Sequence, residues 1–362
     1  MKCEGCGARL QWSKPGKPGY IPKEVFDRRL REGAPLLCQR CFRLRHYGED
    51  LSVGPVKDAL QRLKKFLPNY QHILFIVDIT DFEATYRKEL MKLLHGKPVT
   101  VVVNKIDLLP RAVTIDEIKR WLKNRLGSLR FFPVSAMTGY GLRRLRESLE
   151  KISKPSLVIG CTNVGKSSIL SRLTENDFIS VSDYPGTTQG MLKLKTPGGA
   201  ILVDTPGIPT RDRLTDLLDP SCVMKLKMAR TLSRLTFKPG EGRIIFIGGM
   251  CRFKILKVDE LRPIFQIFAP PYVKLHETSE DRMNERFEEW FGRFLTPPCG
   301  WTDPYQIKWK SVELQIDKGQ ELVVYGLGWV NVKRGPLVVE VTIPEKVGYT
   351  IREGLINPER GG

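Results

Sequence analysis

The order of apolar and polar residues divides the chain into a central region and a C-terminal region. Apolar positions recur at helical spacing over residues 56–67, and two almost unbroken apolar runs follow at 72–79 and 98–103. Apolar runs that alternate with helical segments are typical of a parallel sheet covered on both faces. We therefore predict an α/β fold as far as about Asp219. Its other segments are helices at 115–126, 142–152 and 167–173 and strands at 130–134, 156–159 and 200–203.

The pattern changes after Pro220. A basic helix is predicted over 222–235 and an acidic amphipathic helix over 279–294, with strands at 243–247 and 263–268 between them. Five short β-rich runs follow, at 311–316, 321–325, 329–332, 337–343 and 349–351. We accordingly predict three domains: residues 1–55, an α/β domain at 56–219 and an α+β domain at 220–362.

The chain has a strong excess of positive charge. Its 362 residues include 59 Lys and Arg against 40 Asp and Glu, a net charge of +19, and the first 70 residues are the most basic part. Such a balance favours a polyanionic partner such as RNA, although a basic, well-solvated surface would give the same number. No apolar run of about 18 residues and no secretory signal pattern occurs, so we predict a cytoplasmic protein without a membrane span.

A phosphate-loop motif lies between a predicted strand and a predicted helix. Gly160 to Ser167 have the sequence GCTNVGKS, in the strand–loop–helix context that this motif requires. Glycines allow backbone N–H groups to point at phosphates beside a helix N-terminus. Lys166 is expected to contact the β- and γ-phosphates and Ser167 to bind magnesium. The predicted nucleotide-binding residues of this loop are Gly160, Asn163, Val164, Gly165, Lys166, Ser167 and Ser168.

A second motif supplies the magnesium side of the same site. Asp204-Thr205-Pro206-Gly207 ends the apolar strand at 200–203. We expect Asp204 to lie beside the metal and the Gly207 N–H to sense the γ-phosphate. Upstream, the sequence YPGTT at 184–188 offers a threonine ligand for magnesium. Thr188 is the first candidate and Thr187 the second.

A third motif supplies base specificity. Asn104-Lys105-Ile106-Asp107 follows the strand at 98–103. The Asp107 carboxylate can accept hydrogen bonds from N1–H and the exocyclic amine of guanine, whereas adenine would leave it unpaired. Lys105 is expected to cover the base, and Asn104 to tie loops together. The pair Ser135-Ala136 is expected to donate a backbone N–H to guanine O6, so these residues predict GTP or GDP as the ligand.

The three motifs occur in a rotated order. An ordinary GTPase has its guanine-binding motif after the other two, whereas here it precedes both. This order predicts a circularly permuted P-loop GTPase, in which the ordinary chain ends are joined through residues 142–159. The chain would then run from Gly207 through 211–219 into the C-terminal domain. A segment that responds to the γ-phosphate would thus be covalently joined to that domain.

Two cysteine pairs near the N-terminus predict a structural metal site. Cys3-x2-Cys6 and Cys38-x2-Cys41 can each place two thiolates on one zinc ion. The 31 residues between the pairs exceed the common spacing of about 15–20, which an inserted loop would explain. Zinc is favoured over redox-active or free thiols because four protein ligands leave no open position. We therefore predict that residues 1–55 form a treble-clef-like zinc finger. The other cysteines, Cys161, Cys222, Cys251 and Cys299, are expected to pack as small apolar side chains in a reducing environment.

Together these features resemble the YqeH family of circularly permuted GTPases. The resemblance rests on the motif order, on the finger ending CQRCFRL at 38–44 and on the GLGW turn at 326–329, and it covers essentially the whole chain. It implies GTP hydrolysis coupled to maturation of the small (30S) ribosomal subunit, with the ribosome and its 16S rRNA as partners and a C-terminal domain at 220–362 that interacts with RNA or the ribosome. The expected form is a monomer. GTP binding, zinc and a polyanionic partner follow from the residues themselves.

One position of the expected catalytic site departs from many GTPases. The residue after Gly207, where a glutamine often positions the attacking water, is Ile208. Intrinsic hydrolysis is therefore expected to be slow. In the GTPases that this chain resembles, an asparagine at the place of Asn163 helps to hold a potassium ion, although it can also merely stabilise the loop. The predicted catalytic residues are Lys166, Asn163 and Thr188.

Two functions of different classes fit these residues, and a third, a GTPase partner in a nucleic-acid modification or metabolic complex, would need a cofactor or substrate pocket that the sequence does not indicate. The first is a GTP-driven switch that binds ribosomal RNA in one nucleotide state and leaves in the other. The second is a zinc-containing RNA-binding module that uses GTP as a structural ligand with negligible turnover. Ile208 favours the second, whereas Lys166, Ser167 and Asp204 favour the first. No Ser/His/Asp arrangement indicates any other catalytic chemistry.

Overall fold

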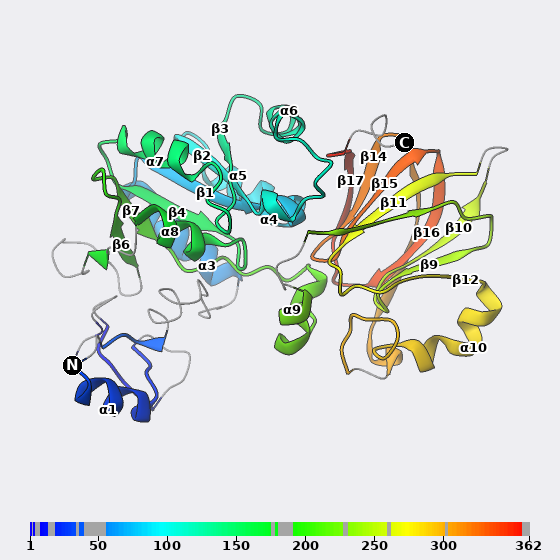
Figure 1. Cartoon of the computed structure of the whole chain (residues 1–362), viewed down its shortest axis with the longest axis horizontal. Coiled ribbons are helices and arrows are strands. Elements are labelled where there is room, and N and C mark those ends of the chain that lie inside the picture. The colour runs from blue at the N-terminus through cyan, green and yellow to red at the C-terminus, as the bar shows by residue number, and fades with distance from the viewer. Residues whose placement is uncertain are drawn as a thin grey trace. The chain divides into compact units, whose positions relative to one another are not determined.

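The chain forms two separately packed units in a computed structural model (Figure 1). The structure describes residues 1, 3, 8–13, 19–33, 36–39, 56–174, 178–179, 191–226, 231–258, 262–300 and 303–356. The first unit comprises Met1–Asp107 and Leu126–Thr210, and the second comprises Leu108–Arg125 and Arg211–Gly362. The predicted three-domain limits stay a prediction, but the chain passes between units after Asp107, Arg125 and Thr210.

A seven-stranded sheet forms the centre of the first unit, in the order β3-β2-β1-β4-β7-β6-β5. Strands β3, β2, β1, β4 and β7 are parallel, and β5 and β6 add an antiparallel edge. Every residue of β1, β2 and β4 is buried, as expected for parallel strands covered on both faces. The bounds are β1 His72–Asp78, β2 Val99–Asn104, β3 Arg130–Pro133, β4 Ser156–Gly160, β5 Phe178–Ile179, β6 Leu192–Lys195 and β7 Ile201–Asp204.

The helices of this unit are α1 Lys23–Arg31, α3 Val56–Phe66, α4 Phe82–Thr85, α5 Lys88–Leu93, α7 Leu142–Glu150 and α8 Lys166–Thr174. The hydrophobic pattern predicts α3, α7 and α8 but does not predict the short helices α4 and α5. On one side of α7, Leu142, Leu145 and Leu149 are buried, which is the spacing of an amphipathic helix. The α/β prediction for this region is confirmed.

The strand register brings the sequence motifs to one edge of the sheet. Asp78 at the end of β1 is the partner of Asn104 at the end of β2, and Ile76 is the partner of Gly160 at the end of β4. On the other side of β4, Asp204 of β7 is the partner of Val158. Because these strands are parallel, their carboxyl ends meet at this edge, where ligands bind in open α/β sheets. This arrangement is consistent with a circularly permuted GTPase.

Two five-stranded antiparallel sheets make up most of the second unit, in the orders β12-β9-β10-β16-β13 and β17-β14-β15-β11-β8. One hydrophobic core contains residues of both sheets, including Ile245 and Phe253 from the first and Phe265 and Val330 from the second. The strands are β8 Ser233–Phe237, β9 Ile244–Ile247, β10 Arg252–Lys257, β11 Ile264–Ala269, β12 Leu275–Thr278, β13 Trp309–Ile316, β14 Gln320–Val324, β15 Gly328–Arg334, β16 Leu337–Pro344 and β17 Tyr349–Glu353.

The helices of this unit are α6 Ile115–Leu126, whose last residue lies in the first unit, α9 Pro220–Leu226 and α10 Glu280–Trp290. The predicted helix over 222–235 is wrong at its C-terminal end, because Ser233 to Phe237 pair with β11 as a strand. The hydrophobic pattern also does not predict strands β10 and β12. The unit is therefore richer in strands than the α+β prediction. Within the described residues, no helix is long and apolar enough to cross a bilayer.

An arginine between two tryptophans holds α6 to the second unit. The Arg352 guanidinium lies 5.0 Å from the centre of the Trp121 ring and 5.6 Å from that of Trp329. Its Nε donates to the buried Glu321 carboxylate at 3.0 Å, and the Trp121 indole donates to the Glu353 carbonyl at 3.1 Å. The helix that follows the guanine motif in sequence is thus part of the second unit, which the hydrophobic pattern alone does not reveal.

The cysteines of the second unit correct one prediction. Cys222 of α9 and Cys299 form a disulfide, with their Cα atoms 5.4 Å apart, so they are neither separate apolar side chains nor reduced thiols as predicted. They lie 77 residues apart in the sequence, and only the folded chain brings them together. Cys161 and Cys251 are buried as predicted, and burial raises the pKa of the Cys251 thiol.

Candidate nucleotide-binding site

The phosphate loop joins β4 to the start of α8. Asn163 and Gly165 both have left-handed backbone conformations, with φ of 69° and 84°. A Cβ on Gly165 would lie 2.3 Å from the Asn104 side-chain nitrogen, and one on Gly160 would lie 2.7 Å from the Ile76 carbonyl oxygen. Both positions therefore require glycine. The loop thus has the tight backbone turn of a phosphate cradle at a helix N-terminus.

Lys166 and Asp204 meet at the centre of the site. The Lys166 ammonium donates to the Asp204 carboxylate and, at 2.5 Å, to the Thr205 carbonyl. Lys166, Ser167 and Asp204 are all buried. A cation for phosphate, a hydroxyl and a carboxylate thus lie at one sheet edge, and magnesium prefers such oxygen ligands. These residues fit Mg²⁺ and a nucleotide phosphate, and Ser167 and Asp204 are the side chains that would hold the metal.

The Asn104 side chain links three loops. Its Nδ2 donates to the Val164 carbonyl of the phosphate loop at 2.9 Å, and its Oδ1 accepts from the Ala136 N–H at 3.1 Å. Ser135 is fully buried, and its hydroxyl accepts from the Thr138 N–H at 3.0 Å, which shapes the loop that follows β3. The structure therefore places Asn104, Ser135 and Ala136 together with the phosphate loop, as their predicted roles require.

Lys105 has a partner that the sequence motifs do not reveal. Its ammonium donates to Asp78 Oδ2 at 2.5 Å and to the Asn163 carbonyl at 2.8 Å. Asp78 is buried, and it also accepts from the Thr80 N–H at 2.9 Å. One feature of the sequence could have indicated this partner. Asp78 ends an apolar strand, and the strand beside it in the sheet ends in the guanine motif. Asp78 positions Lys105, whose φ of 68° is itself uncommon for a non-glycine residue.

The segment after Asp204 is bonded to the phosphate loop. The Ile208 N–H donates to the Gly160 carbonyl, and the Thr162 N–H donates to the Ile208 carbonyl, both at 2.9 Å. A Cβ on Gly207 would lie 3.2 Å from the Thr162 side chain. Ile208 is only 5% exposed, so an apolar side chain fills the place where a water-positioning glutamine is often found.

The structure describes only some of the remaining predicted site residues. Asp107 lies in the 3₁₀ turn Ile106–Leu108, partly exposed, and Ser168 lies in the first turn of α8. Thr187 and Thr188 lie outside the described residues. The individual roles of the site residues stay predictions, although their placement at one sheet edge is a feature of the fold.

Two protein families match separate parts of the chain. The family described as 50S ribosome-binding GTPase matches residues 156–232, and the family described as YqeH-like, C-terminal matches residues 262–355. YqeH of Bacillus subtilis is 29% identical over 368 residues, which cover 98% of this chain and 99% of the relative. The chain is thus similar to YqeH over almost its whole length, and its C-terminal part matches the YqeH-like family. The match to the GTPase family indicates a P-loop GTPase domain that binds GTP together with Mg²⁺.

More distant matches have other names. NO-associated protein 1 of Arabidopsis thaliana, named as chloroplastic or mitochondrial, is 25% identical over 391 residues, or 91% of this chain and 69% of the relative. Among solved structures, YjeQ of Thermotoga maritima is 26% identical with a TM-score of 0.29. That match covers 39% of this chain and 49% of the YjeQ chain, so this chain spans about half of that structure.

The close approach of Asn104 to Gly165 gives a prediction for nucleotide affinity. Replacing Gly165 with Ala should weaken GDP binding by about tenfold or more, because the new methyl group displaces the Asn104 amide. Gly199→Ala is the matched control, since Gly199 also has a left-handed φ, 92°, but its Cβ would meet only the end of Lys195 at 3.9 Å. Titration with a fluorescent GDP analogue measures both variants. Equal losses of GDP affinity in the two variants would show that backbone strain, and not displacement of the Asn104 amide, weakens binding.

Proposed function

We propose that this chain is a GTP-hydrolysing switch in the assembly of the small ribosomal subunit. The observation that best supports it is the Asn104 side chain, which bonds the guanine motif to both the phosphate loop and the loop that contains Ala136. A protein that used only the phosphates would not need this connection. The net charge of +19 and the match to a family described as ribosome-binding favour a ribosomal partner.

The chemistry would be phosphoryl transfer to water. Ser167, Asp204 and Thr188 would hold magnesium, which neutralises charge on the β- and γ-phosphates when bound. Lys166 would leave its contact with Asp204 to bind phosphate oxygens, and the Gly207 N–H would face the γ-phosphate. Because Ile208 cannot orient a water molecule, turnover by this machinery alone should be slow.

A potassium ion beside Asn163 would compensate for the missing glutamine. The Asn163 side chain is exposed, and its backbone carbonyl accepts from Lys105, so this residue lies where the phosphate loop meets the guanine motif. A monovalent cation there would add positive charge near the developing transition state.

Turnover measured by phosphate release should therefore rise severalfold when sodium is replaced by potassium. Asn163→Ala should abolish that rise. Asn163→Gly serves as a second variant, because glycine accepts the φ of 69° and removes only the side chain. Equal rates in both salts for the unmodified chain would contradict the proposal.

The ribosomal partner can be tested by sedimentation. The chain should pellet with purified 30S subunits when GTP or a non-hydrolysable analogue is bound, and less with GDP. Lys166→Ala should lose this nucleotide dependence. Sedimentation with 30S subunits that does not depend on the bound nucleotide would contradict the proposed switch, and so would no sedimentation at all. Since the matched GTPase family is described by 50S binding, purified 50S subunits form a parallel arm, and preference for them would overturn the assignment to the small subunit.

An alternative function is an RNA-binding module that holds GTP as a structural ligand. The buried Ile208 side chain favours it, whereas the contacts of Lys166 and Asp204 favour catalysis. Single-turnover hydrolysis in the presence of 30S subunits separates the two. No phosphate release above the rate without protein would favour the structural role.

The N-terminal segment is proposed to bind zinc through Cys3, Cys6, Cys38 and Cys41. Cys3 and Cys38 are buried in one small core with Leu10, Ile21 and Leu37, and the Cys38 N–H donates to Cys3 Sγ at 3.1 Å. The structure thus brings one cysteine of each pair together, while Cys6 and Cys41 lie outside the described residues. We further propose a cytoplasmic monomer.

Metal analysis of the purified chain should find one zinc ion per molecule. Cys38→Ser should lose it, because one of the four thiolates is removed. Cys251→Ser is the control, since Cys251 is equally buried but lies in the second unit. Zinc retained at full content in Cys38→Ser would contradict the proposed ligand set.

A further inference from the structure

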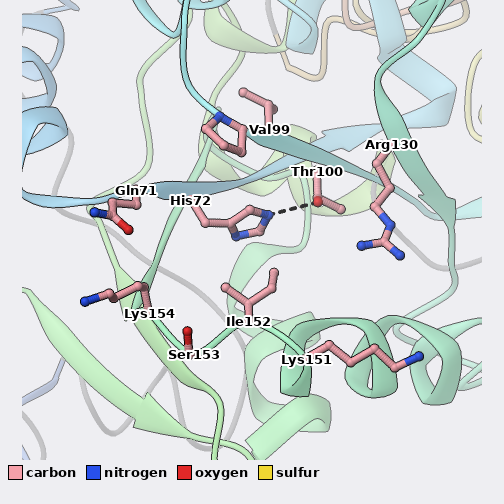
Figure 2. A pocket seen from close by; sticks show the side chains of 10 residues that line it. Gln71, His72, Val99, Thr100, Arg130, Lys151, Ile152, Ser153 and Lys154 are labelled. Atoms are coloured by element: carbon pink, nitrogen blue, oxygen red, sulfur yellow. Dashed lines mark hydrogen bonds between the residues drawn. The ribbon is translucent and has the colours of Figure 1, made fainter.

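The first unit has a pocket at the edge of the sheet away from the nucleotide site. Its volume is about 460 Å³, and it is lined by Gln71, His72, Pro98, Val99, Thr100, Arg130, Lys151, Ile152, Ser153 and Lys154 (Figure 2). These residues start β1, β2 and β3 or directly precede β4, so the pocket lies at the amino ends of the parallel strands. The nucleotide motifs lie at the carboxyl ends. With seven residues in β1, the two sites are about 20 Å apart.

The rim of this pocket is basic. Arg130, Lys151 and Lys154 contribute three cations, and the ten lining residues include no carboxylate. None of the three cations forms an ion pair with a carboxylate in the described part of the chain. All three side chains are exposed. An open rim of uncompensated positive charge attracts anions.

The floor of the pocket is polar but neutral. His72 is buried, its Nδ1 lies 2.8 Å from the Ser156 hydroxyl, and its Nε2 lies 3.0 Å from the Thr100 hydroxyl (Figure 2 shows the second contact). Burial lowers the pKa of His72, and the nearby Arg130 lowers it further. Both ring nitrogens are engaged and the ring is neutral near pH 7. The positive charge that a ligand meets therefore comes from the rim.

The spread of the cations indicates the shape of the ligand. Figure 2 shows Arg130 and Lys154 on opposite sides of His72, with the ammonium groups of Lys151 and Lys154 extending away from the floor in different directions. A small phosphorylated metabolite would need convergent donors in an enclosed cavity. Cations spread around an exposed rim instead match successive phosphates of a nucleic-acid strand.

We propose that this pocket, through Arg130, Lys151 and Lys154, binds backbone phosphates of RNA at a site separate from the nucleotide site. The proposal rests on the RNA partner of the proposed function and specifies the surface that contacts it. Phosphate contacts fix the position of a protein on RNA and do not read its sequence. Binding here should therefore be independent of base sequence and strongly dependent on salt.

The test compares two double variants of the full chain with equal loss of charge. Lys151→Gln with Lys154→Gln removes two rim cations. Lys64→Gln with Lys65→Gln removes two exposed lysines at the end of α3, outside the pocket. Arg130→Gln is a further variant. Fluorescence anisotropy with labelled oligouridine and oligoadenine, at several KCl concentrations, gives affinity and salt slope. GDP affinity reports whether each variant retains its fold.

We expect the rim double variant to bind both oligonucleotides about tenfold more weakly. Its salt slope should fall by about 1 for each RNA phosphate that the rim no longer neutralises. The α3 variant should stay within twofold of the unmodified chain, and GDP affinity should be unchanged throughout. If the variants at Lys151 and Lys154 are perturbed in folding, weaker binding by Arg130→Gln supplies the same test. Equal effects of the rim and α3 variants would overturn the site and leave the proposed function intact.

Three other outcomes also overturn the proposal. No binding of RNA by the unmodified chain would contradict both the site and the RNA partner of the proposed function. Competition by polyglutamate as effective as competition by RNA of equal charge would show that the rim attracts any polyanion, including acidic protein, and does not select phosphates. Excess inorganic phosphate should compete only weakly, whereas strong competition would point to a free phosphorylated ligand.

Discussion

The side-chain amide of Asn104 is the contact on which the nucleotide site depends. Its nitrogen donates to the phosphate loop and its oxygen accepts from the loop after β3, so one side chain fixes the distance between phosphate-binding and base-binding elements. Gly165 makes the contact possible, because a Cβ there would occupy the space of the amide nitrogen. A second link runs from Asp78 through Lys105 to the Asn163 carbonyl. The two bonds of Asn104 are buried, and mutually satisfied buried hydrogen bonds hold loops in one arrangement.

Strand register explains how the three motifs can meet at one site although their order along the chain is rotated. A parallel sheet assembles its ligand site from strand ends, and strand register, not sequence order, decides which ends are neighbours. The rotated order of the motifs changes which other parts of the chain are covalently joined to the site. Leu214, four residues beyond the first unit, packs in the core of the second unit and donates its N–H to the Tyr325 carbonyl at 2.7 Å. The chain also enters the second unit directly after Asp107.

The α/β sheet is predictable from the sequence, because buried parallel strands leave long apolar runs such as the one that forms β1. Local patterns also predict α6 to the residue, yet they cannot show that Trp121 stacks on Arg352 and places that helix in the second unit. The first three residues of strand β8, 233–235, lie within the predicted helix, but pairing with β11 decides their conformation. The role of Asp78 is not visible in the motifs, because it comes from a neighbouring strand. The Cys222–Cys299 bond likewise joins segments that are distant in sequence.

The central claim is that the loop ending in Asp107 recognises guanine at a site shared with the phosphate loop. Competition binding of GDP, ADP and xanthosine diphosphate to the unmodified chain and to Asp107→Asn tests it most directly. A carboxylate accepts from both guanine donors, whereas an amide offers one acceptor and one donor and so matches xanthine, which has a carbonyl in place of the amine. We predict strong preference for GDP in the unmodified chain and for the xanthine nucleotide in the variant. Unchanged preference for GDP in Asp107→Asn would contradict the claim.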